Sequence, residues 1–131
     1  MRSNIREKCV RLTYYVVIML LAACASELPR TSTPHTPVAG TPRQIQLAAA
    51  VPLSSSTGYS RTLPANSIWR QTGTIPEGDV YRIEDSVFTV EARHIHEAYI
   101  VVKDQSVVGY YLPVERAFSP LSSKVNLPTK Q

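Results

Sequence analysis

The stretch "AYIVVKDQSVVGYYL", Ala98 to Leu112, decides the fold class of this chain. Two runs rich in valine, isoleucine and tyrosine flank the polar residues "KDQS". β-Branched and aromatic residues favour strands, and a short polar connection between two such runs predicts a β-hairpin. Its loop has either two residues, Asp104-Gln105, or four, because Asp-Gln lacks the glycine that tight primed turns prefer.

The two-residue loop predicts a definite register for this hairpin. It pairs Val102 with Val107 and Tyr99 with Tyr110. Both strands carry apolar residues at odd and even positions, which predicts a central place in a sheet that is covered on two faces. Gly109, inside the second strand, indicates a bulge or the close approach of another backbone.

A second hairpin is predicted just upstream. The runs "VYRI" and "VFTV" flank Asp85-Ser86, and this loop would pair Tyr81 with Val90 and Ile83 with Phe88. That register gathers the apolar side chains on one face. Before it, "IPEGDV" predicts a turn, because proline fixes φ and glycine accepts conformations that other residues resist.

These elements predict a mainly β fold, a small antiparallel hairpin or meander domain that spans residues 67–121. The run "LPVERAF" after the second hairpin is compatible with one helical turn or a short edge strand. Residues 122–131 form a predicted tail in which "KVNL" is the candidate for a last edge strand. A domain of this size has a marginal core, so we expect a partner, an oligomer or the preceding segment to complete it.

The preceding segment, residues 24–66, is predicted to be a disordered tether. Six of the ten prolines of the chain lie here among many Ser and Thr residues, and no strand or helix period persists. A coil of this length spans roughly 35 Å. One apolar island, Ile45 to Leu53, is compatible with a short helix, a strand added to the edge of the domain, or a docking motif.

The N-terminus is typical of a secretory signal. Four basic residues precede the uncharged run "LTYYVVIMLLAA". Twelve residues are too few for an ordinary membrane-spanning helix, which needs about 20, but they fit the apolar region of a signal peptide.

That run ends in "LAAC", Leu21 to Cys24, which resembles the lipobox of bacterial lipoprotein precursors. The resemblance implies that residues 1–23 are a signal peptide, and that Cys24 becomes a lipidated N-terminus carrying acyl chains such as palmitate. Several acyl chains give a stable membrane anchor where one would be marginal. Because Ala25 rather than aspartate follows Cys24, the resemblance also implies delivery to the outer membrane, with the domain facing the periplasm.

Cleavage at this point changes the charge and the thiol content of the chain. The precursor has a formal charge of +4, but four of its fourteen basic and one of its ten acidic residues precede Cys24. The mature chain would carry ten basic and nine acidic residues, so its charge does not predict a nucleic-acid partner. With Cys9 removed and Cys24 lipidated, neither cysteine remains for a disulfide.

The stretch "EARHIHEAY", Glu91 to Tyr99, is the main candidate for chemistry. On a strand, His94 and His96 would share a face, as zinc ligands do, but a zinc site needs a third protein ligand. Glu91, Glu97 and the distant His35 are the candidates. We predict a polar connection between the two hairpins and no metal, cofactor or catalytic site; a pH-responsive or partner-binding spot is the alternative role.

The candidate surface for a partner or ligand comprises Trp69, His94, His96 and Glu97. Trp69 stands just before the first strong strand and is the best candidate for an exposed anchor. A Gly-rich phosphate loop and a nucleophile elbow are both absent from the sequence. We therefore expect a lipid-anchored, non-catalytic binding or assembly module, for example in an envelope or secretion complex. The alternative is a periplasmic metal- or ligand-binding sensor that uses His94 and His96.

Overall fold

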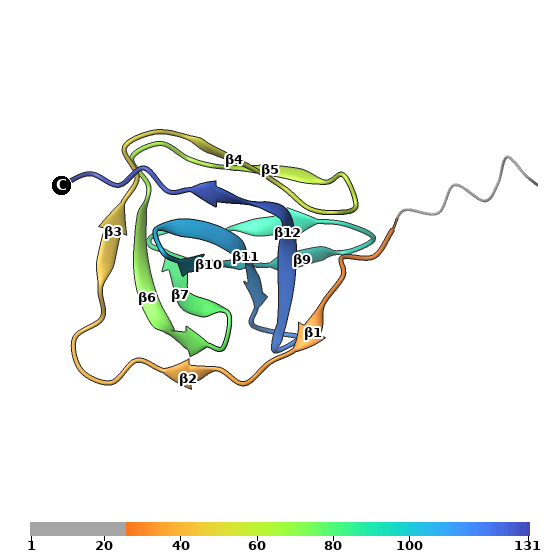
Figure 1. Ribbon diagram of the computed structural model, residues 1–131, viewed down its shortest axis with the longest axis horizontal. Coiled ribbons are helices and arrows are strands. Elements are labelled where there is room, and N and C mark those ends of the chain that lie inside the picture. The colour runs from red at the N-terminus through yellow and green to blue at the C-terminus, as the bar shows by residue number, and fades with distance from the viewer. Residues whose placement is uncertain (1–25) are drawn as a thin grey trace, which may run out of the picture.

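The computed structural model describes residues 26–131, so the predicted signal peptide and the lipidation site Cys24 lie outside the described residues. Within that range the chain forms twelve β-strands and no helix, and every strand pair is antiparallel (Figure 1). The prediction of a mainly β, antiparallel fold is confirmed.

One curled sheet forms the body of the molecule. Its central strands are neighbours in the order β12 (Ala117–Asn126), β11 (Ser106–Leu112), β10 (Tyr99–Lys103), β7 (Gly78–Ile83) and β6 (Ile68–Ile75). At its edges, β1 (Thr31–Ser32) pairs with β12, and both β2 (Thr36–Pro37) and β3 (Gln44–Gln46) pair with β6. Two hairpins form separate sheets: β4 (Val51–Ser54) with β5 (Ser60–Leu63), and β8 (Thr89–Glu91) with β9 (Ile95–Glu97).

The β10–β11 hairpin forms with the two-residue loop. Val102 pairs with Val107, and Asp104 and Gln105 connect the strands. Both loop residues have positive φ, 51° and 62°. This is the conformation of a primed turn, whose twist matches that of the flanking strands.

Beyond the loop, the predicted register of this hairpin is wrong by one residue. A bulge shifts the pairing so that Val101 faces Gly109 and Tyr99 faces Tyr111 instead of Tyr110. The predicted close approach at Gly109 is confirmed, because a Cβ atom there would lie 2.5 Å from a carbonyl oxygen of β12.

The predicted hairpin between "VYRI" and "VFTV" does not form. Tyr81, in β7, pairs with β6 on one side and β10 on the other, while Val90, in β8, pairs with His96 in β9. Pro76-Glu77 turns β6 into β7, and this pairing continues along most of both strands. At Asp85, φ is positive (59°), and the chain leaves the main sheet just after β7 ends.

The segment predicted to be a disordered tether instead contributes strands β1 to β5. Its apolar side chains complete the core, since Leu28, Leu47, Val51, Leu53 and Leu63 are each no more than 3% exposed. The burial of these side chains offsets the entropy cost of ordering the segment. The polar, proline-rich composition had indicated that too little apolar surface was present for this. The apolar island takes the edge-strand alternative in part: β3 lies on the sheet, and β4 begins the separate β4–β5 hairpin.

The predicted tail 122–131 is also part of the fold. Residues to Asn126 belong to β12, and Leu127 is buried. The amide of Ala48 donates to the carbonyl of Pro128, and that of Lys130 to the carbonyl of Gln46, both at 2.8 Å. These bonds link the end of β12 to β3, so the curled sheet is connected around most of its circumference.

The sheet is apolar on both faces, as the composition of the central strands predicts. The larger cluster lies on one face and includes Trp69, Ile100 and Tyr110 together with the side chains of the N-terminal segment. The smaller cluster lies on the other face around Val101 and Tyr111. With residues 28–63 contributing, the core is much larger than residues 67–121 could supply alone.

Candidate functional site

Trp69 is not an exposed anchor, contrary to the prediction. Its side chain is fully buried in β6, and its indole N–H donates to the hydroxyl of Ser67 at 2.9 Å. The ring meets Phe88 edge to face at 5.5 Å. Since β3 and β7 pair with β6 on its two sides, Trp69 lies in the centre of the sheet and stabilises the core.

The other three predicted site residues lie on or beside the β8–β9 hairpin, with different exposures. His94, in the turn, is exposed, whereas His96 is buried. Glu97 is half-buried and lies 3.9 Å from the guanidinium of Arg82. The two imidazole rings stand edge to face with centroids 6.5 Å apart. The predicted polar connection is therefore a short hairpin, and it directs one histidine outward and the other inward.

His96 is held by a residue that sequence reasoning missed. Its Nδ1 lies 2.6 Å from Oε1 of Glu115, in the turn between β11 and β12. A carboxylate acceptor selects the form of the ring in which Nδ1 carries hydrogen. The second oxygen of Glu115, Oε2, is buried without a hydrogen-bond partner among the described residues. The contact spans nineteen positions, so no local pattern could have indicated it.

Glu115 also lines a pocket with a volume of about 790 Å³. The remaining lining residues are Ser32, Thr33, Pro34, His35, Tyr111 and Arg116. We call this site the strap pocket, because residues 32–35 cross from β1 on one edge of the sheet to β2 on the other. Its lining residues are mixed, with three hydroxyls, a carboxylate, a guanidinium and two aromatic rings.

His35 fixes the strap against the sheet. Its ring stacks on Tyr111 with centroids 5.0 Å apart, and its Nε2 lies 3.2 Å from the hydroxyl of Thr72. A Cβ atom at Gly73 would come within 2.8 Å of the ring, so only glycine at this position leaves room for the His35 side chain. The position of His35 is therefore structural, and it sets one wall of the strap pocket.

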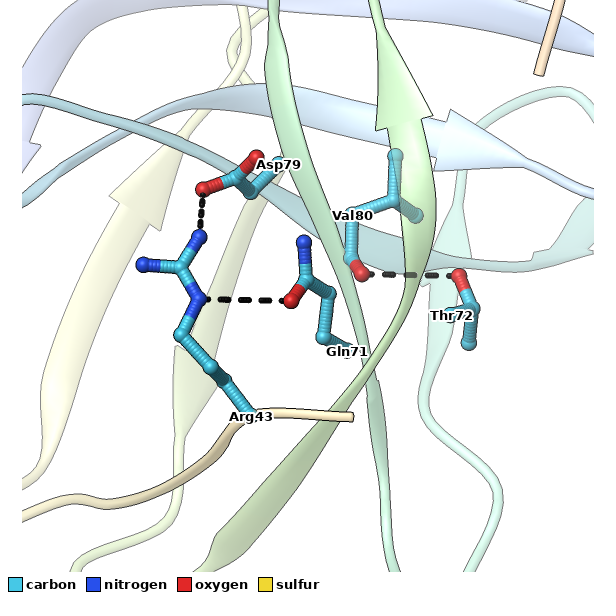
Figure 2. A network of polar contacts seen from close by, with 5 residues as sticks. All are labelled: Arg43, Gln71, Thr72, Asp79 and Val80. Carbon is cyan, nitrogen blue, oxygen red and sulfur yellow. Dashed lines mark hydrogen bonds and ion pairs between the residues drawn. The ribbon is translucent and has the colours of Figure 1, made fainter. Parts of the chain in front are cut away.

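A smaller pocket of about 270 Å³ opens beside β3 and the β10–β11 turn. Arg43 contributes its polar rim, donating to the carboxylate of Asp79 and to the side-chain carbonyl of Gln71 (Figure 2). Burial raises the pKa of the nearby Tyr81 phenol, and the charge of Arg43 partly opposes this rise. Because the Arg43 side chain is 64% exposed, its ion pair is worth less than about 1 kcal/mol. We assign this network to holding β3 on the sheet.

In the described part of the chain, no three His, Cys, Asp or Glu residues gather as metal ligands would. Glu115 is the hydrogen-bond partner of His96 there.

Comparison with known proteins adds no relative. No protein family model, curated protein or solved structure matches this chain. Among residues 26–131, none forms part of a helix long and apolar enough to cross a membrane.

Proposed function

We propose that this protein is a lipid-anchored component of the bacterial cell envelope whose β domain binds a partner protein without catalysis, for example within an envelope or secretion complex. The observation that carries the proposal is the wall of the strap pocket. There, a buried carboxylate oxygen of Glu115 lacks a donor among the described residues. Val114, which precedes Glu115 in the sequence and does not line the pocket, is 79% exposed.

A partner segment would complete both features. A buried acceptor without a donor destabilises a protein by about 1–3 kcal/mol, so a partner that reorients the Glu115 side chain and supplies a donor would recover that free energy on binding. Val114 offers an apolar contact beside it. β1 is the outermost strand of the main sheet, and an edge strand next to a pocket suits an added extended segment.

In-cell cross-linking tests the binding function. A photo-cross-linking residue replaces Val114 in the full-length protein, and exposed Thr41, between β2 and β3, serves as the control position. We expect one identified partner at position 114 and not at 41. Glu115→Gln, with the cross-linker still at 114, should then weaken capture. Recovery of the free protein alone, or equal capture at both positions, contradicts the proposal.

A separate experiment tests the anchor. Cys24→Ser should leave unprocessed precursor without lipid, whereas Cys9→Ser, inside the signal peptide, should leave processing unchanged. Mass spectrometry of the membrane fraction reads both results. Normal maturation of the Cys24→Ser variant would overturn the localisation.

A further inference from the structure

The first buried side chain of the described domain lies very close in sequence to the proposed lipid anchor. Leu28 is 3% exposed and belongs to the larger core cluster. Only three residues separate it from Cys24. A fully extended chain advances at most about 3.6 Å per residue, so the two Cα atoms are no more than about 14 Å apart. The lipid would therefore hold the folded domain at the bilayer surface, because no long tether intervenes.

The surroundings of Leu28 show which end of the domain this is. Leu28 lines a small crevice with Tyr59 and Arg61, at the turn of the β4–β5 hairpin, and with Val90 and Glu91 of β8. Figure 1 shows that the described chain begins beside the turns of both hairpins. The C-terminus lies on the opposite side of the molecule.

The residues exposed at this end are compatible with a bilayer surface. The turn of the β4–β5 hairpin, "SSSTGYS" at residues 54–60, carries no charge. The β8–β9 turn exposes Arg93 and His94, and Ile95 after it is 71% exposed. An apolar residue beside a basic one is suited to the headgroup region, where basic side chains meet lipid phosphates.

We propose that the two hairpin turns, residues 55–59 and 92–94, rest against the bilayer that holds the acyl chains of Cys24. This inference rests on the proposed lipid anchor and adds the orientation of the domain. The β10–β11 turn then points away from the membrane, because Gln105 bonds to Leu127 near the C-terminus. In this orientation the strap pocket lies no farther from the bilayer than the width of the domain. A partner would therefore bind close to the membrane.

Site-specific fluorescence quenching tests the orientation. The mature lipoprotein has no free thiol, so single cysteines can be placed at exposed positions: Ser56→Cys and His94→Cys at the proposed membrane end, and Lys103→Cys as the matched control beside the β10–β11 turn. Each lipidated variant is labelled with a fluorophore and reconstituted into phosphatidylethanolamine and phosphatidylglycerol vesicles that contain a lipid with a nitroxide headgroup. We expect several-fold stronger quenching at positions 56 and 94 than at 103.

A spacer variant separates the anchor's effect from an intrinsic affinity for lipid. About 20 Gly and Ser residues inserted after Ser26 span roughly 25 Å as a coil and should remove the difference between the labels. Equal quenching at all three positions of a protein whose lipidation is verified by mass overturns the orientation alone. A Cys24 without lipid overturns the anchor, and the orientation with it.

Discussion

The two accessory hairpins share one architecture but differ in what they bury. Both are two-stranded antiparallel sheets outside the main sheet. In the β4–β5 hairpin, Val51, Leu53 and Leu63 are all buried. In the β8–β9 hairpin Val90 is buried, but the polar ring of His96 takes a second interior position and Ile95 stays exposed.

The two hairpins also differ in the contacts that attach them to the rest of the protein. The β4–β5 hairpin is held by apolar burial and by contacts with β12, where Ser55 bridges Leu121 and the hydroxyl of Ser122 donates to the carbonyl of Ser54. The β8–β9 hairpin buries Val90 in the larger core cluster, and it adds a polar contact between His96 and a carboxylate. Apolar burial needs no partner, whereas Glu115 in the polar contact also lines the strap pocket, where a partner would touch it. We therefore expect the first hairpin to be a permanent cover of the core, and the second to be the one that binding can influence.

The largest expected effect is a cavity under the first hairpin. Leu53→Ala removes a fully buried side chain and should lower the free energy of unfolding by about 3 kcal/mol, measured by urea denaturation. Val87→Ala, beside the second hairpin, truncates a side chain that is 62% exposed and should change it by less than about 0.5 kcal/mol. Similar losses for both would mean that the β4–β5 hairpin is not part of the core.

The next effect concerns Tyr110, which lies under both hairpins. Burial raises its pKa from 10.0 to about 12, and Arg61 partly opposes the rise. The unfolded chain then loses this proton at lower pH than the folded one, so stability is complete below pH 10 and falls as the pH rises toward 12. The expected loss is about 2 kcal/mol by pH 12. The free energy of unfolding, measured by denaturation at several pH values from 10 to 12, should fall less steeply with pH in Tyr110→Phe than in the wild type. The control Tyr59→Phe should keep the steeper fall.

The sequence predicted the parts of the fold that local pattern determines. The loop at Asp104-Gln105 follows from neighbouring residues. Gly109 indicates a bulge or a close backbone approach, but the local pattern does not show at which pair the register of β10 and β11 shifts. The disorder predicted for residues 24–66 is wrong partly because edge strands tolerate proline. Pro37 lies in β2 and Pro52 in β4.

The candidate site was less predictable than the fold. The segment around His94 and His96 was predicted to be a polar connection and instead forms a short hairpin, and the partner of His96 comes from a turn nineteen residues away. Trp69 was misplaced because a single apolar residue at the start of a strand is equally compatible with an anchor and with the core. The pairing of β6 with β3 decides between them, and β3 lies in the segment that was predicted to be disordered.

A smaller effect isolates the polar attachment of the second hairpin. We expect a double-mutant cycle of His96→Ala and Glu115→Ala to give a coupling free energy of about 1.5 kcal/mol, the scale of a hydrogen bond to a charged group. The matched cycle of Arg82→Ala and Glu97→Ala, on a longer and more exposed ion pair, should give less than about 0.5 kcal/mol. Equal coupling free energies for the two pairs would show that the His96–Glu115 contact is no stronger than an exposed ion pair.

The smallest effect tests whether one hairpin supports the other. Arg61, in β5, donates from Nε to the carbonyl of Thr89 at 2.8 Å and lies over the ring of Phe88, 5.1 Å from its centroid. Arg61→Ala should lower global stability by only about 1 kcal/mol, because this side chain is exposed. Its effect on amide hydrogen exchange should be local: faster in β8 and β9, unchanged in β4. Arg61→Lys keeps the charge but loses the planar donor, so its exchange rates should lie between those of the wild type and Arg61→Ala. Faster exchange in β4 as well would show that the two hairpins open as one unit, and the permanent cover and the responsive hairpin would then be a single element.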